Sequence, residues 1–147
     1  MVDLKVALRT TLLLVDDDIE QLEARALLLK MSGFTVLAAG SPAEAITIMA
    51  QRPGPVDVAI LDYEMPVMNG CVLADYLRAR YPELAVILYS SAVDIPESEL
   101  GSIDALVPKG GGVAQLLEGV AMFMQLRATP LDSAFKHGIP VSASDWF

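Results

Sequence analysis

Cysteine and histidine each occur only once in the 147 residues of this sequence. The single cysteine, Cys71, excludes an intrachain disulfide, so a reduced, cytoplasmic location is expected. Together with the single histidine, His137, it supplies too few Cys and His ligands for a structural zinc site. The sequence therefore indicates neither disulfide chemistry nor structural zinc.

Basic residues are scarce as well. The chain has 10 Lys and Arg against 19 Asp and Glu, which gives a formal net charge of −9. Sequence-independent binding of nucleic acid requires clustered cations that neutralise phosphates, and attraction to an anionic membrane surface requires the same. Neither nucleic acid nor a membrane is therefore an expected partner.

Long apolar runs are missing, and none approaches the roughly 20 residues that a membrane-spanning helix needs. The first residues, MVDLKVALRTT, lack the basic-then-apolar pattern of a signal peptide, because charged residues interrupt them. Apolar residues still make up 54% of the chain, enough for the core of one domain of ordinary size.

Short apolar runs alternate with longer segments of helical period. Several of the runs are apolar at every position, which is typical of strands that are covered on both faces. We therefore predict an α/β fold with a doubly wound parallel sheet and right-handed crossovers. The predicted strands are Leu12–Val15, Phe34–Ala38, Val58–Leu61, Val86–Tyr89 and Ala105–Val107.

The helical segments carry local start and stop signals. Ser41 is a natural N-cap, Pro42 suits the first helical position, and Gly33 is a plausible end for the preceding helix. The segment at Pro96–Leu100 is short and acidic and has the weakest helical pattern. The other predicted helices cover residues 19–31, the segment after Ser41, Cys71–Arg80 and Val113–Leu126.

Polar residues stand where the predicted strands end. Asp16 and Asp17 follow the first strand, Asp62 the third, Ser90 the fourth and Lys109 the fifth. The carboxyl ends of parallel strands lie at one edge of a sheet, so these side chains should converge. Three carboxylates form an all-oxygen site for Mg²⁺ or Mn²⁺. The set fits phosphoryl transfer to a carboxylate, with Asp62 as acceptor and with Lys109 and Ser90 on the phosphoryl oxygens.

Each of these residues also has a simpler interpretation. A run of acids is often just a solvated loop, Ser90 could cap the following turn, and Lys109 could be a surface lysine. Asp18, the third acid of the run, suits the N-terminus of a helix, where the dipole favours negative charge.

The segments LLLVDDD, VDVAILDYEMPVMNG, AVILYSSA and ALVPKG resemble, in this order, the receiver domain of bacterial two-component response regulators. The resemblance covers about Leu12 to Leu126. It implies a flavodoxin-like (βα)5 fold with strand order 2-1-3-4-5. The receiver domain would occupy residues 11–128, between an N-terminal extension at 1–10 and a C-terminal tail at 129–147.

The resemblance also implies roles for the residues at the strand ends. Asp62 would accept a phosphoryl group from a histidine kinase or phosphotransfer protein. Asp16, Asp17 and Asp62 would bind Mg²⁺ together with the backbone carbonyl of Glu64. Ser90 would sense the phosphoryl group, and Lys109 would bind it.

The output of such a domain is a protein interaction that depends on phosphorylation. The resemblance implies that the surface of the fourth helix, fifth strand and last helix contacts an unidentified downstream protein or a second copy in a homodimer. It implies no enzymatic activity beyond self-catalysed phosphorylation and dephosphorylation.

The side chain of Glu64 would either steer the hydrolytic water or lie in solvent. His137 lies in the tail, so the chain is not expected to be its own phosphodonor.

Three features depart from the family pattern. Leu106 stands where the family commonly has an aromatic residue that swings inward on activation. Gly110 follows the lysine where the family commonly has a cis proline, and glycine is not expected to hold a cis bond. The tail at 129–147 is too short for an output domain, and is expected either to be disordered or to fold back through Phe135, Trp146 and Phe147.

Two alternatives follow from these observations. A receiver-like scaffold that works without phosphate would explain Leu106 and Gly110. A phosphatase of the haloacid dehalogenase type would use Asp16 in the motif Asp16-x-Asp18, but it also needs an acidic pair beyond its lysine. After Lys109 the remaining acids are well separated, which weighs against the phosphatase.

Overall fold

We analysed the fold in a computed structural model, which describes residues 4–92 and 94–128, with side chains as far as Met124. The predicted tail, including His137, lies outside the described residues. No helix in the described part of the chain is both long enough and apolar enough to cross a membrane.

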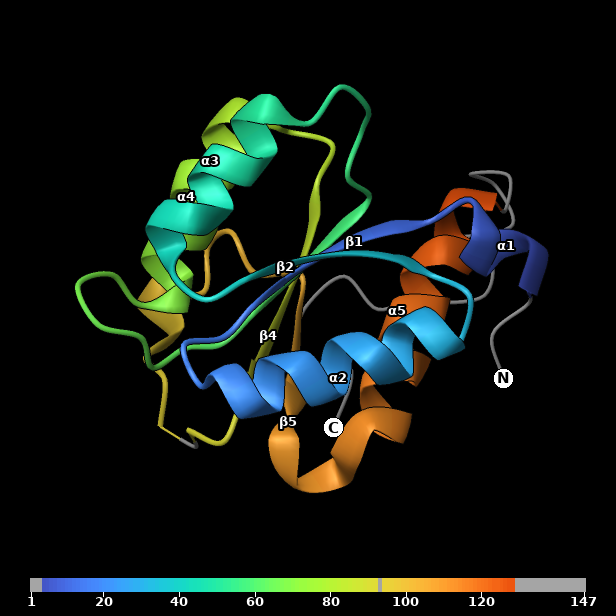
Figure 1. The fold of residues 1–147 in the computed structure, drawn as a ribbon. Coiled ribbons are helices and arrows are strands. Elements are labelled where there is room, and N and C mark those ends of the chain that lie inside the picture. Colours follow the sequence, from blue (N-terminus) through green and yellow to red (C-terminus); the bar gives the residue numbers. More distant parts are fainter. Residues whose placement is uncertain (1–3, 93, 129–147) are drawn as a thin grey trace.

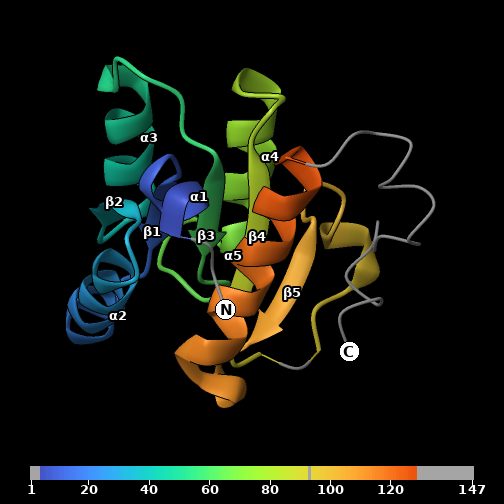
Figure 2. The same cartoon turned by 90° about the vertical axis from the view of Figure 1, so that its right-hand side faces the viewer.

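Five parallel strands form one sheet with the order β2-β1-β3-β4-β5. The predicted fold class and strand order are therefore confirmed, and each predicted strand lies within one residue of the observed bounds. Figure 2 shows β2 and β5 at opposite edges of the sheet. The strands are β1 (Thr11–Val15), β2 (Thr35–Ala39), β3 (Val58–Leu61), β4 (Ala85–Ser90) and β5 (Ala105–Pro108).

Local capping interactions begin the helices where the sequence predicts them. The Asp18 carboxylate accepts a hydrogen bond from Gln21 N at 3.3 Å, and Ser41 Oγ accepts one from Glu44 N at 3.1 Å. Gly33 follows the helix that Asp18 caps and has a φ of 104°, a conformation that favours glycine. The helices are α1 (Leu4–Leu8), α2 (Ile19–Met31), α3 (Pro42–Gln51), α4 (Gly70–Arg80) and α5 (Gly112–Ala128).

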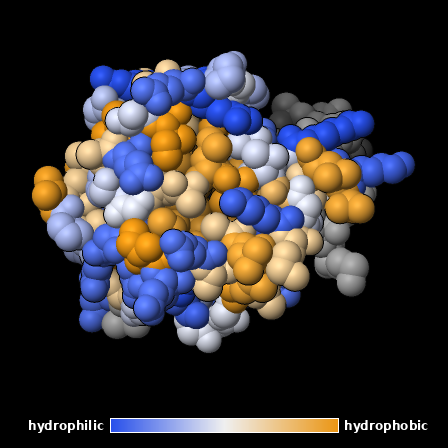
Figure 3. All heavy atoms as spheres, viewed as in Figure 1, coloured by the Kyte–Doolittle hydropathy of each residue, from blue (hydrophilic) through white to orange (hydrophobic). Residues whose placement is uncertain are grey.

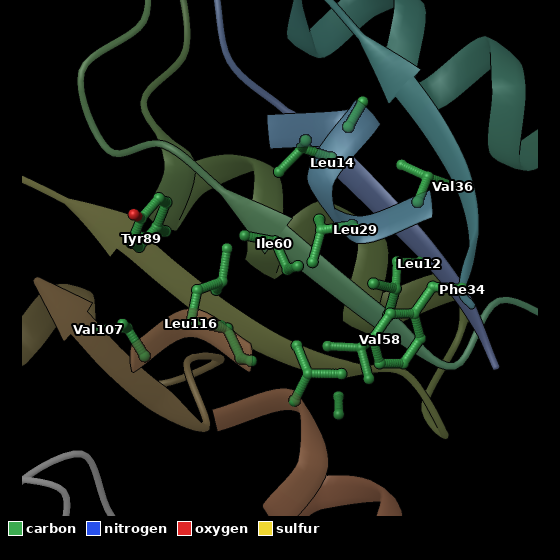
Figure 4. Packing of buried hydrophobic residues seen from close by; sticks show 14 of the residues in the cluster. Leu12, Leu14, Leu29, Phe34, Val36, Val58, Ile60, Tyr89, Val107 and Leu116 are labelled. Atoms are coloured by element: carbon green, nitrogen blue, oxygen red, sulfur yellow. The ribbon is translucent and has the colours of Figure 1, made fainter. Parts of the chain in front are cut away.

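The helices cover the sheet on both faces. Helices α2 and α5 pack on one face, and α3 and α4 pack on the other (Figure 1). Figure 4 shows Leu29 of α2 and Leu116 of α5 around Ile60 of the central strand β3, and all three side chains are fully buried. Because both faces are covered, the central strands have to be apolar at every position, as the sequence shows.

The N-terminal extension contains a helix that the sequence analysis did not predict. Ala7 of α1 is buried, and Thr10 Oγ1 lies 2.6 Å from Val6 O and 3.0 Å from Met124 Sδ of α5. A helix of five residues is too short to show a helical period, and contacts with α5 stabilise the segment. Residues 4–10 thus pack against the rest of the described structure.

The prediction of an α-helix at Pro96–Leu100, the fourth helix of the sequence analysis, is wrong. This segment is not the element labelled α4. In the described residues between β4 and β5, the only helical element is the 3₁₀ helix η1 (Glu97–Glu99). Pro96 precedes η1 and a turn at Gly101 follows it, which leaves too few residues for a helix of several turns. The output surface remains a prediction, and with η1 in place of the predicted fourth helix it would consist of η1, β5 and α5.

Cys71 lies buried on α4, as expected for a small apolar filler. Burial raises the pKa of its thiol from 9.0 to about 11, and the charges of Glu99 and Asp75 add to this. We expect a thiol reagent at pH 8 to label the folded protein at least about 100-fold more slowly than the urea-unfolded chain. The raised pKa also predicts that the free energy of unfolding falls as the pH rises from about 9 to about 11. Labelling at equal rates in both states would contradict the expectation.

Candidate functional site

The ends of β1 and β3 place two carboxylates next to each other. Val15 pairs with Leu61, and the ladder continues one step further through Asp62 N, which donates to Val15 O at 3.0 Å. On the other side, Asp16 N donates to Ala39 O at 3.2 Å. These backbone hydrogen bonds hold Asp16 and Asp62 at the carboxyl edge of the sheet.

Asp16, Asp17 and Asp62 form one acidic group, in which one carboxylate oxygen of each lies within 4.8 Å of the others. Asp16 is buried, Asp62 is partly buried and Asp17 is exposed. An all-oxygen donor set that opens to solvent on one side fits a hard divalent cation that keeps several waters. The structure thus brings together the three carboxylates that the sequence assigns to a metal.

Lys109 lies between two of these carboxylates. Its ammonium nitrogen is 3.1 Å from Asp16 Oδ2 and 3.3 Å from Asp62 Oδ1, and the side chain is 15% exposed. The residue begins the 3₁₀ helix η2 (Lys109–Gly111), which follows β5 directly. No cis peptide bond occurs in the described residues, so this loop differs from the cis-proline loop of the family pattern, as the sequence led us to expect.

Burial raises the pKa of Asp62 above its ordinary value. The ammonium of Lys109 acts in the opposite direction, while the negative charges of Asp16 and Asp17 add to the effect of burial. The net result is that the ionised form of Asp62 is less favoured than that of an aspartate in water. A cation at this site would favour the ionised form of Asp62.

The site contains a second cation that the sequence analysis did not identify. Arg25 NH1 lies 3.1 Å from Asp16 Oδ2, and the arginine side chain is 15% exposed. Arg25 comes three residues after Leu22 and four before Leu29, both buried, so it occupies the core-facing side of α2. A charged residue within an apolar stripe needs a partner, and this signal in the sequence could have identified it.

Ser90 caps the turn that follows β4, which is the simpler of its two interpretations. Its Oγ accepts a hydrogen bond from Ala92 N at 3.0 Å, and in the described part of the chain no hydrogen bond joins it to the acidic group. The hydroxyl hydrogen is still able to donate to another oxygen. Ser90 and Leu106 also line one cavity of about 310 Å³ at the end of β4 and β5.

The loop after Asp62 has a strained turn. Val67 has a φ of 74°, and Met68 N donates to Pro66 O at 2.8 Å, which closes a three-residue turn around it. A β-branched residue rarely adopts this conformation. The Val67 side chain is fully exposed, so nothing in the described structure holds it in place by burial.

The same loop is tied to η1. Tyr63 OH donates to the Glu99 carboxylate at 3.0 Å, and Asn69 Nδ2 lies 3.4 Å from the same group. The hydrogen bond to Glu99 raises the pKa of Tyr63. Glu64, two residues after Asp62, is exposed, and its backbone carbonyl remains a predicted metal ligand.

Comparison with known proteins identifies the family. The family profile described as response regulator receiver domain matches residues 12–105. The chain belongs to this family. Receiver domains are generally signalling modules that interact with histidine kinases or phosphotransfer proteins, and phosphoryl acceptance is implied by membership.

Relatives among curated proteins include regulators and sensors. This receiver domain is 34% identical over 127 residues to the transcriptional regulatory protein PrrA of Mycobacterium bovis, covering 83% of this chain and 53% of PrrA. It is 36% identical over 80 residues to the sensor kinase CckA of Brucella abortus, covering 54% of this chain and 8% of CckA. The chain thus spans about half or less of the length of these relatives.

Solved structures have the same fold. The response regulator TrrA of Thermotoga maritima, in complex with Mg(2+)-BeF, is 25% identical with a TM-score of 0.71, over 78% of this chain and 98% of TrrA. A receiver domain protein of Clostridium thermocellum is 23% identical with a TM-score of 0.74, over 81% of this chain and 97% of that one.

Proposed function

We propose that this receiver domain accepts a phosphoryl group on Asp62 and signals through an interaction that depends on phosphorylation. The placement of Lys109 between Asp16 and Asp62, at 3.1 and 3.3 Å, carries the proposal. It puts an ammonium group beside the acceptor carboxylate, where charge on a transferring phosphoryl group would develop.

The proposed reaction is a displacement at phosphorus. A carboxylate oxygen of Asp62 forms a bond to the phosphorus of a phosphohistidine, the N–P bond breaks, and the released imidazole takes up a proton. Lys109 then neutralises one phosphoryl oxygen, and the Ser90 hydroxyl donates a hydrogen bond to another. Mg²⁺ or Mn²⁺ held by Asp16, Asp17, Asp62 and the Glu64 carbonyl would neutralise further phosphoryl charge.

The phosphodonor that we propose is a histidine kinase or phosphotransfer protein in the cytoplasm. It has to reach the open edge at Asp62, where the start of α2 and the loop after Asp62 carry exposed apolar side chains. Ile19 is 50% exposed at the start of α2, and Val67 is fully exposed after Asp62. Figure 3 shows hydrophobic patches among hydrophilic side chains on the face where α2 lies. Such a mixed surface suits a transient protein partner.

Phosphorylation by a small donor tests the proposal. We expect the purified protein with Mg²⁺ and acetyl phosphate to gain the mass of one phosphoryl group, and Asp62→Asn to gain none. Asp75→Asn, which removes an exposed carboxylate from α4, is the matched control and should label like the wild type. Intact mass spectrometry gives the readout, and peptide mapping identifies the labelled residue.

The alternatives predict different results. Label on Asp16 in place of Asp62 would support a phosphatase of the haloacid dehalogenase type. A wild-type protein that gains no phosphoryl group would support a scaffold that works without phosphate. Label on Asp62 would contradict both.

A further inference from the structure

Arg25 and Lys109 bind the same oxygen of Asp16. Each cation lies 3.1 Å from Asp16 Oδ2, while Asp16 Oδ1 accepts a hydrogen bond from Asp18 N at 2.9 Å. The Asp16 side chain is only 5% exposed. Both oxygens of this proposed metal ligand are therefore engaged before any metal binds.

Arg25 is also held where it is. Its guanidinium carbon lies 5.0 Å from the ring centroid of Tyr89, a buried residue of β4. Figure 4 shows Tyr89 on the face of the sheet that carries Leu29 of α2, the helix of Arg25. Stacking over an aromatic ring and pairing with a carboxylate favour one position of a planar guanidinium. Arg25 is therefore expected to stay beside Asp16 when a second cation approaches.

Arg25 changes the net charge of the acidic group. The three carboxylates carry three negative charges, and Lys109 and Arg25 carry two positive ones, which leaves one net negative charge for a divalent cation. Without Arg25 the same site would carry two. Arg25 thus halves the net negative charge that attracts the metal ion. Its own positive charge also repels the metal ion at short range.

We propose that Arg25 is a positioning residue that orients Asp16 in the metal-free protein and lowers the affinity of the acidic group for Mg²⁺. The inference rests on the metal site of the proposed function. In this role, Arg25 determines the Mg²⁺ concentration that the receiver needs before it can be phosphorylated.

Metal titration of the protein without any phosphodonor tests this. We expect Arg25→Gln, which removes the charge, to bind Mg²⁺ and Mn²⁺ on the order of tenfold more tightly than the wild type. Arg25→Lys keeps the charge that sets the metal affinity in this proposal, and should bind within about threefold of the wild type. Titration calorimetry for Mg²⁺ and the signal of free Mn²⁺ in electron spin resonance give independent readouts.

A matched control and a second variant complete the design. Arg80→Gln removes a charge from the exposed end of α4, where the arginine stacks on Tyr76 at 3.9 Å, and should leave affinity unchanged. If Arg25→Gln does not fold, Arg25→Met replaces it, because an apolar side chain suits the core-facing side of α2. The same tenfold gain is expected.

The outcomes separate the two proposals. Equal or weaker metal binding by the charge-removing variant, in a protein that unfolds at the wild-type temperature, would overturn the role of Arg25. A loss of folding alone would not tighten metal binding, so a gain supports that role. A wild type that binds no metal would overturn the proposed metal site, and with it the role of Arg25.

Discussion

Replacing Lys109 with alanine is expected to slow phosphorylation of Asp62 by at least about 100-fold, because the substitution removes a preorganised cation from the place where phosphoryl charge develops. The ammonium lies 3.3 Å from Asp62 Oδ1, and no other side chain in the described part of the chain forms a salt bridge with Asp62. The rate is measured as incorporation from acetyl phosphate at saturating Mg²⁺.

Two further variants show whether the position or merely the charge matters. Lys30→Ala removes an exposed lysine from α2 and should leave the rate unchanged. Lys109→Arg keeps the charge but replaces the compact ammonium with a larger, planar guanidinium, and should remain slow. A Lys109→Ala protein that phosphorylates at the wild-type rate would contradict the proposed role.

A single methyl group at Gly70 is expected to damage both stability and phosphorylation. A Cβ atom there would overlap the backbone carbonyl oxygen of Asp62 and lie 2.8 Å from Leu88 Cδ1. The backbone oxygen cannot move without moving the acceptor residue itself. We expect Gly70→Ala to lower the free energy of unfolding by about 1–3 kcal/mol, the usual effect of overpacking.

Urea unfolding measures the loss of stability, and acetyl phosphate labelling measures the effect on Asp62. Gly101→Ala is the matched control, because a Cβ at Gly101 meets nothing within 4 Å. The control should retain wild-type stability and labelling. If Gly70→Ala is as stable as this control and phosphorylates normally, the tight contact between α4 and the acceptor does not constrain the site.

The strands and most helices were predictable because their signals are local. Val58–Leu61 is apolar at every position and is buried at every position, since a central parallel strand is covered on both faces. Ser41 and Pro42 begin α3 because a side-chain cap and a fixed φ act within one turn of the chain.

The predictions failed where neighbours far along the chain decide the outcome. Helix α1 has too few residues for a helical pattern, and its place depends on packing such as that of Thr10 against Met124, 114 residues away. The sequence predicts a helix at Pro96–Leu100, but the short length of the segment and the turn residues on either side of it leave only the 3₁₀ helix η1.

The sequence by itself determined the order of strands and helices and the residues that end each strand, because apolar periodicity and capping act between neighbours in the chain. The tertiary structure alone decided that a second cation, Arg25, faces those carboxylates, whereas Lys109 is expected there because it follows the fifth strand. Lys109 reaches Asp16 across 93 residues of chain, and Arg25 reaches the same oxygen from the core-facing side of α2. Contacts of this kind depend on how the helices pack on the sheet, since pairing of a buried charge is fixed by distance in space and not by position in the chain.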